Sequence, residues 1–185
     1  STTAIISYGR DEDISRVLDV IGNAYKHSSW QVRHASANFL RCFQGAHKFL
    51  FATEHADKTM NMVTELLADE RREVSSAAMA ALTGILSASP VKIVAKLVKK
   101  YALVAGRSKM KRQKKSSGVE SLETEHEAEA LLAKELIRTR NQQTSVFFLC
   151  AAVMAQPYET PPYVPAALAA ISKHSFERNA PLGVR

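Results

Sequence analysis

The sequence predicts an all-α protein built of antiparallel helix pairs that stack side by side. The long periodic stretches are rich in Ala, Leu, Lys and Glu, which favour helix, and aromatic residues make up only 7% of the 185 residues. Apolar residues recur at the i, i+3, i+4, i+7 spacing of a helix face. The same pattern returns at a constant offset, so that Val74 takes the place of Val32 and Leu82 takes the place of Leu40.

Four helices are expected before residue 90. The first follows Asp11-Glu12-Asp13, whose negative charge complements the dipole at a helix N-terminus. The second begins at the capping box Ser28-x-x-Gln31, the third begins near Ala56, and Asp69 is expected to cap the fourth. The residues expected to face the core are Ile14, Val17, Leu18, Ile21, Tyr25, Val32, Ala35, Phe39, Leu40, Phe43, Met60, Val63, Leu66, Leu67, Val74, Ala77, Ala78, Ala81, Leu82 and Ile85.

A fifth helix and a basic loop are expected next. Ser89-Pro90 would supply the N-cap and an N1 proline for a helix from Val91 to about Ala105. From 106 to 123 the hydrophobic period disappears, which predicts a solvated, flexible loop. The chain is therefore divided into helix pairs over 1–105, the loop over 106–123, and further helix pairs over 124–185 that are truncated at the C-terminus.

Three helical segments are expected after the loop. The capping box Thr124-x-x-Glu127 opens one helix, and a separate apolar helix is expected from about Gln142 to Ala155. The prolines at 157, 161, 162 and 165 end that helix, and Val164 to Ile171 forms the next. Asn179 to Arg185 is interpreted as the start of another helix. The residues expected to reach the core from the first of these helices are Leu131, Leu132 and Leu136.

The spacing of the helix pairs is typical of HEAT and armadillo arrays, which repeat every ~40 residues and wind into an α-α superhelix. Two local motifs agree, because Trp30-Gln31-Val32-Arg33 and Asp69-x-x-x-x-Val74 resemble the polar turn and Val-Arg that open the inner helix of a HEAT unit. One helix pair cannot bury its own apolar face, so neighbouring pairs must stack. A fragment of such an array is expected to self-associate through its exposed repeat ends, where Leu182 and Val184 lack a partner helix.

Positive charge is concentrated in one part of the chain. Lys and Arg number 25 against 18 Asp and Glu, and no acidic residue occurs between Val74 and Val119. The interpretations left open for the basic tract are a solvated loop, a nuclear-import signal, and an anion or nucleic-acid contact. Nucleic acid is disfavoured because no aromatic residue lies among these cations to stack on bases. The basic tract consists of Lys109, Lys111, Arg112, Lys114 and Lys115.

The sequence offers no motif for catalysis, a cofactor or a metal. The six histidines show neither HExxH nor paired Cys/His spacing, and the glycines form no nucleotide-binding pattern. Cys42 and Cys150 are interpreted as reduced core thiols, and a hydrolase using a Cys/His pair formed only in space is a distant alternative. The longest apolar run, Val146 to Ala155, is too short to cross a membrane. We expect a protein that is not an enzyme.

Three blocks of sequence resemble the carboxy-terminal region of the proteasome activator subunit 4 family, which are large HEAT-repeat proteins. They are Ser29-Trp30-x-x-Arg33 through Phe51, Leu66-Leu67-x-Asp69 with Leu82-x-Gly84, and Pro157-Tyr158-x-x-Pro161 followed by Pro165. The resemblance implies a protein of the nucleus and cytoplasm that docks on the proteasome core particle and opens its gate without ATP or ubiquitin. Family members end in a tail with a penultimate Tyr, and since this sequence stops before such a tail, the fragment alone is not expected to activate the proteasome.

The resemblance also implies an acetyl-lysine pocket for acetylated histones, centred on an Asn-Phe pair. Those positions fall on Ser89 and Pro90, so the amide that would bind the acetyl group is missing. The alternative function is a HEAT/armadillo adaptor or transport-type module that binds peptides or proteins in a concave groove. Such modules carry an Asn ladder on their inner helices, where this sequence has Ala, Ser and Phe.

Overall fold

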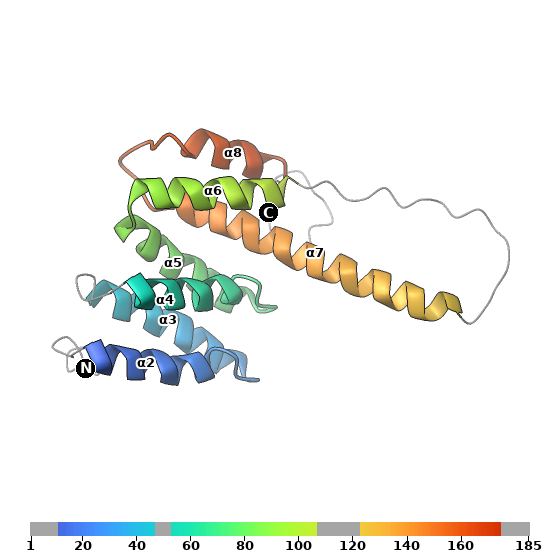
Figure 1. Ribbon diagram of the computed structural model, residues 1–185, viewed down its shortest axis with the longest axis horizontal. Coiled ribbons are helices and arrows are strands. Elements are labelled where there is room, and N and C mark those ends of the chain that lie inside the picture. Colours follow the sequence, from blue (N-terminus) through green and yellow to red (C-terminus); the bar gives the residue numbers. More distant parts are fainter. Residues whose placement is uncertain (1–10, 47–52, 107–122, 175–185) are drawn as a thin grey trace.

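The computed structural model describes residues 11–46, 53–106 and 123–174, and within them the chain forms seven α-helices and no strand (Figure 1). The all-α prediction is thereby confirmed for this part of the chain. The segment 175–185, where a further helix is predicted, lies outside it. The helices are α2 (Asp11–Ala24), α3 (Trp30–Ala46), α4 (Thr53–Leu66), α5 (Arg72–Ala88), α6 (Val91–Ala105), α7 (Glu123–Met154) and α8 (Val164–Ser172).

The helices lie in two layers. Figure 1 shows α2, α4, α6 and α8 one above another, with α3, α5 and the C-terminal half of α7 crossing behind them. Helix α3 packs on α5 and α5 packs on α7, while α2 packs on α4 and α6 on α8. Consecutive helices also pack as pairs, α2 with α3, α4 with α5 and α6 with α7. The paired arrangement agrees with the repeat seen in the sequence, whereas a superhelix stays a prediction.

The core lies between the two layers. Most of the predicted inward residues are buried, and Leu40 and Leu82, which the repeat pattern aligns, are both fully buried. Burying one such side chain contributes about 1.5–3 kcal/mol, so this interior supplies much of the driving force for folding. The exception is Ala35, which is exposed. The largest fully buried side chains are Phe43, Phe148, Ile14, Leu18, Leu40, Leu67, Leu82, Leu86, Leu149, Val63 and Val74.

Helix α7 is one continuous helix of 32 residues, and the prediction of two helices here is wrong. No Pro or Gly interrupts the sequence between Glu123 and Met154, so nothing in the backbone requires a break. Figure 1 shows its N-terminal half extending away from the other helices. The prediction that its leucines are core residues is therefore also wrong. Leu131, Leu132 and Leu136 are 65%, 62% and 70% exposed.

Two predicted helix caps differ from the structure. The N-cap of α5 is Arg71 rather than Asp69, and it makes no side-chain cap. Ser89 is the C-cap of α5, and its hydroxyl donates to the Ile85 carbonyl at 2.8 Å. Pro90 is the N-cap of α6 rather than its first helical residue. Its ψ of 134° is not helical, so the Ser-Pro pair ends one helix and starts the next.

Candidate functional site

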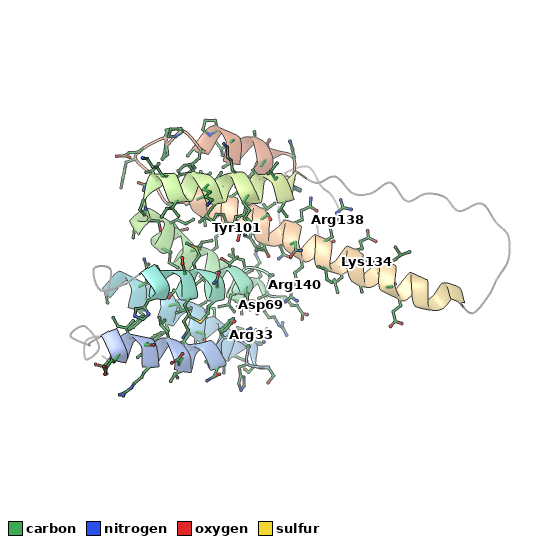
Figure 2. All side chains as sticks on the ribbon, viewed as in Figure 1. Arg33, Asp69, Tyr101, Lys134, Arg138 and Arg140 are labelled. Atoms are coloured by element: carbon green, nitrogen blue, oxygen red, sulfur yellow. The ribbon has the colours of Figure 1, made fainter. Side chains whose placement is uncertain are left out.

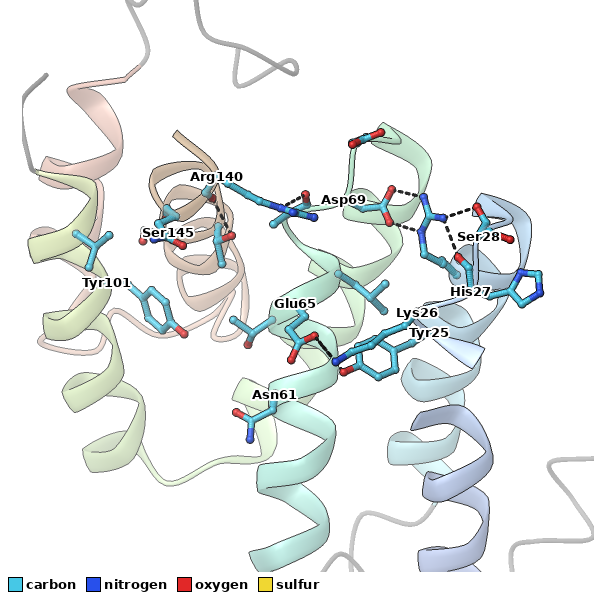
Figure 3. Close-up of a pocket in the computed structure, with 18 residues that line it drawn as sticks. Tyr25, Lys26, His27, Ser28, Asn61, Glu65, Asp69, Tyr101, Arg140 and Ser145 are labelled. Carbon is cyan, nitrogen blue, oxygen red and sulfur yellow. Dashed lines mark hydrogen bonds and ion pairs between the residues drawn. The ribbon is translucent and has the colours of Figure 1, made fainter. Parts of the chain in front are cut away.

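An open cleft of about 1020 Å³ lies between α4 and α6 (Figure 3). One wall comes from the turn that follows α2 and from the C-terminal end of α4, and the other from α6 and the middle of α7. The turn between α4 and α5, residues 68–70, forms its rim. Helix C-termini and turns expose polar groups, so the lining mixes charged, amide and hydroxyl side chains with apolar ones.

The pair Arg33 and Asp69 joins two successive helix pairs at this rim (Figure 2). Arg33 Nε donates to Asp69 Oδ2 at 2.5 Å and Nη2 donates to Oδ1 at 3.0 Å, which is the two-point geometry that arginine makes with a carboxylate. Arg33 Nη1 also donates to the carbonyls of His27 and Ser28, both at 2.9 Å. One guanidinium therefore fastens the α2–α3 turn to the α4–α5 turn.

The same turn is held from its other side by α7. Arg140 Nε donates to the Ala68 carbonyl at 3.2 Å, although the two residues are far apart in the sequence. Figure 3 shows Arg140 and Asp69 at the same end of the cleft. The α4–α5 turn thus contacts one arginine from the preceding helix pair and another from the following one, and this fixes the rim of the cleft.

The charge on Asp69 is stabilised by its surroundings. Burial alone would raise the pKa of this carboxyl group, because only 7% of the side chain is exposed. The hydrogen bonds from Arg33 and from the backbone N–H of Arg71, at 2.9 Å, outweigh burial and lower the pKa below its ordinary value. The hydrogen bond with Asp69 in turn raises the pKa of Arg33. The pair is therefore fully ionised at neutral pH.

A second polar cluster lies lower in the cleft. Tyr25 Oη donates to Glu65 Oε2 at 3.0 Å, and Lys26 Nζ lies 3.3 Å from the same oxygen. The hydrogen bond to Tyr25 and then the one to Glu65 raise the pKa of Lys26. Lys26 and Glu65 are 63% and 56% exposed, so water screens this ion pair and it contributes little to stability. The cluster instead places both signs of charge on the wall of the cleft.

Tyr101 lines the opposite wall and comes from α6 (Figure 3). Its ring stacks on Phe148 of α7 with centroids 3.9 Å apart. Burial raises the pKa of Tyr101, and a hydrogen bond with Thr64 acts in the opposite direction. The phenol is therefore a neutral hydrogen-bonding group at neutral pH, held by an apolar contact behind it.

The cleft has the chemistry of a binding surface. It offers amides, hydroxyls and both signs of charge. In the described part of the chain no group of three His, Cys, Asp or Glu side chains could hold a metal ion. Burial raises the pKa of Cys150, which disfavours the reactive thiolate. Cys42 is exposed, so the prediction of a core thiol at this position is wrong. Among the same residues, none of the helices is long and apolar enough to cross a membrane.

Among the residues predicted as sites from the sequence, the described pair Ser89 and Pro90 does not line this cleft. The basic tract, Lys109, Lys111, Arg112, Lys114 and Lys115, lies outside the described residues. Ser89 and Pro90 lie at the turn between α5 and α6. The Pro90 carbonyl accepts hydrogen bonds from the N–H groups of Ile93 and Val94, so the pair serves the turn itself.

Sequence similarity to known proteins covers most of this chain. The C-terminal part of the chain, residues 139–184, matches the family described as "Proteasome activator complex subunit 4-like, C-terminal". The chain is 25% identical over 168 residues to proteasome activator subunit 4 of Arabidopsis thaliana, which covers 90% of this chain. It is 22% identical to the Xenopus laevis protein and 25% identical to the Bos taurus protein, each over 85% of this chain.

The chain is a distant homologue of proteasome activator subunit 4. The resemblance identified from the sequence is thereby confirmed. The chain spans 8% of the length of each of these relatives. The family match begins one residue before Arg140 and takes in the packed half of α7 and all of α8.

Sequence reasoning missed the partners of the site residues in this chain. It identified the segments around Arg33 and Asp69 as repeat-opening motifs, but it assigned Asp69 to a helix cap. The missed signal is that the two motifs place charged residues of opposite sign at adjacent turns of a stacked array. Neither Arg140 nor Tyr101 lies in a motif that could have singled it out.

Proposed function

We propose that this chain is a non-catalytic helical-repeat scaffold from an ATP- and ubiquitin-independent proteasome activator, and that it helps the longer protein dock on the proteasome core particle. The observation that carries the proposal is the homology to proteasome activator subunit 4 over 85–90% of the chain. The role of the chain would be to present a stiff surface of fixed curvature.

The packing of the helices supports such a scaffold. The succession of α3 on α5 and α5 on α7 is the contact pattern of stacked hairpins, in which each pair touches only its neighbours. Arg33 and Arg140 bind the turns of adjacent pairs together, which resists shear between them. We infer that the array continues as a HEAT-type α-α superhelix in the longer protein, which acts in both nucleus and cytoplasm.

A direct test is binding of the chain to purified proteasome core particle by biolayer interferometry, without ATP or ubiquitin. We expect saturable binding. The control is Phe148→Ala, which removes the ring behind Tyr101 and disturbs the packing of α6 on α7 without changing charge. A chain that is folded by circular dichroism but does not bind at concentrations of about 100 μM would contradict a direct docking role.

A chimera tests the same proposal inside an active protein. The segment of the Arabidopsis thaliana relative that aligns with this chain is replaced by this chain, and ATP-independent hydrolysis of a fluorogenic peptide by the core particle is measured. Retained stimulation supports a scaffold role. Loss of stimulation in a chimera that remains monodisperse would show that the chain does not substitute for the matching segment.

The α4–α6 cleft favours a second candidate function, an adaptor that binds peptides in a groove. Its volume of about 1020 Å³ is at the upper end of the range of ligand pockets. Its polar walls suit an extended peptide backbone. The test is a fluorescently labelled random peptide library, with Tyr101→Phe as the conservative variant and Tyr101→Ala as the disruptive one.

The basic tract supports the nuclear part of the proposed localisation. Its five cations, Lys109 to Lys115, would act as an import signal or an anion-binding segment. Fusing residues 106–123 to a fluorescent reporter, with and without alanine at the five cations, tests the import role. Acetyl-lysine binding at Ser89 and Pro90 has less support, because the Ser89 hydroxyl already donates to Ile85 and proline has no N–H to offer.

A further inference from the structure

Helix α6 presents a row of lysines on its outer side. Lys92, Lys96 and Lys99 follow one another at the helical spacing i, i+4, i+7, and Leu103 continues the row at i+11. All four side chains are exposed, and Leu103 is 73% exposed. We call these four residues the lysine ridge. Its three charges lie within about 10 Å along the helix axis, at a rise of about 1.5 Å per residue.

The lysine ridge lies on the side of α6 that faces away from the other helices. The buried residues of α6 are Val94, Val98 and Ala105, and the helical repeat places them opposite the ridge. Figure 1 shows α6 between α4 and α8, with α7 crossing behind it. Helices α7 and α8 pack on α6, and the cleft separates it from α4. A further helix pair would stack beyond α2 or α8, so it would leave the ridge uncovered.

The positive charge of the ridge is not balanced nearby. The described segments 74–106 and 160–174, which include all of α6 and α8, contain no Asp or Glu. Within the described part of the chain, no lysine of the ridge forms an ion pair. Lys100, next to the ridge, adds a fourth charge, and its Nζ lies 5.5 Å from the centroid of the Tyr101 ring. Charges of one sign gathered in this way attract an acidic partner.

Aliphatic side chains accompany the lysines. Leu103 ends the ridge, and Ile93, which is 52% exposed, lies beside it. None of the four ridge residues is an arginine or an aromatic residue, the types that read or stack on bases most often. A protein segment offers carboxylates and apolar side chains together. The composition of the ridge therefore favours a protein partner over a nucleic acid.

We propose that the lysine ridge docks an acidic α-helix of a partner protein. A second helix has the same rise per residue as α6, so carboxylates at the matching spacing meet the three lysines in register. The helix dipoles favour an antiparallel partner, whose C-terminal end lies beside the N-terminal end of α6. Read from its N-terminus, the docking face of that partner is Leu-x-x-x-Glu-x-x-Glu-x-x-x-Glu, and its leucine meets Leu103.

The contact is small, and this sets the expected affinity. One helix on one ridge buries less surface than a standard protein interface, and exposed ion pairs each contribute little. We therefore expect a dissociation constant on the order of 10–100 μM. Raising the salt concentration from about 0.05 M to about 0.3 M should weaken binding at least about fivefold, because the charges are then screened over shorter distances.

The test is the fluorescence anisotropy of a labelled peptide titrated with the whole chain. The probe is an alanine-based helix of about 20 residues that carries the leucine and the three glutamates at the stated spacing and is crosslinked on its far side to keep it helical. The control peptide has the same composition, with its glutamates spread around the helix. We expect the control peptide to bind at least about tenfold more weakly than the probe.

Variants of the chain locate the contact. Lys96→Glu should raise the dissociation constant of the probe at least about tenfold, since it places a like charge at the middle of the ridge. The matched control is Lys111→Glu, which makes the same change of net charge in the basic tract. Leu103→Ala should raise the dissociation constant about threefold at either salt concentration, because salt does not screen an apolar contact. Lys96 and Leu103 are exposed, so their variants should keep the helical circular dichroism of the unaltered chain.

Three outcomes would overturn the proposal. The first is that the probe binds no better than the control peptide, or does not bind at all up to about 1 mM. The second is that Lys111→Glu weakens binding as much as Lys96→Glu does, which would assign the contact to the basic tract. The third is that a DNA duplex of about 20 base pairs binds more tightly than the probe and loses this binding in Lys96→Glu, which would make the ridge a nucleic-acid contact.

Discussion

Asp69→Ala should be the most destabilising change of a single charged residue at the cleft. The Asp69 side chain is 7% exposed and Arg33 is 19% exposed, so the pair is largely removed from water. Breaking a buried pair costs about 3–5 kcal/mol, because one charge is left without its partner. Arg33 would keep the carbonyls of His27 and Ser28, and some of its surface is hydrated. We therefore expect a loss at the low end, about 3 kcal/mol.

The measurement is urea unfolding followed by circular dichroism at neutral pH. The matched control is Asp19→Ala, which removes the carboxylate of a surface pair with Lys58. Asp19 is 65% exposed, so this change should cost no more than about 1 kcal/mol. If Asp69→Ala and Asp19→Ala lower the free energy of unfolding by the same amount, the Arg33–Asp69 ion pair does not stabilise the packing of the two helix pairs.

Three further predictions concern the same core and cleft. The pKa of Asp69 is lowered on folding, so its stabilising contribution should be complete above the ordinary carboxyl pKa of about 3.9. That contribution should be lost as the pH falls through the lower pKa of the folded state. Asp69→Asn should flatten this part of the profile of stability against pH, measured by urea unfolding. Leu82→Ala should cost about 2–5 kcal/mol, whereas Leu103→Ala, at a side chain that is 73% exposed, should stay within about 0.5 kcal/mol; equal thermal shifts would contradict the assigned core. Tyr101→Phe should cost about 1 kcal/mol by loss of the hydroxyl contact, and Tyr101→Ala clearly more by loss of the stack on Phe148; the reverse order in thermal melts would refute the stacking role.

The helices themselves could be predicted from the sequence because they depend on local patterns. The apolar spacing of α3 is repeated in α5, and the aligned residues Leu40 and Leu82 are both fully buried. Periodicity reports which residues share a helix face, and stacking of neighbouring pairs then buries that face. This is why the core between the two layers agreed so well with the prediction.

Helix α7 could not be predicted in the same way. Its N-terminal half has the leucines of an amphipathic helix, but whether Leu132 and Leu136 are covered depends on a neighbouring helix. Periodicity does not contain that information. The pairing of Asp69 with Arg33 was missed for a related reason: a carboxylate at a turn can cap its own helix or bind another turn, and only the relative position of the helix pairs decides between them.

The continuity of α7 also determines how its projecting half is formed. Isolated helices of about a dozen residues are marginal in water, because nucleating the first turn is costly. From Glu129 to Ile137 every described side chain is exposed, so tertiary packing adds little there. The buried turns around Phe148 and Leu149 act as a permanent nucleus, from which the outer turns only have to propagate. Amide hydrogen exchange along this one helix should therefore slow progressively from its free tip toward its anchored end.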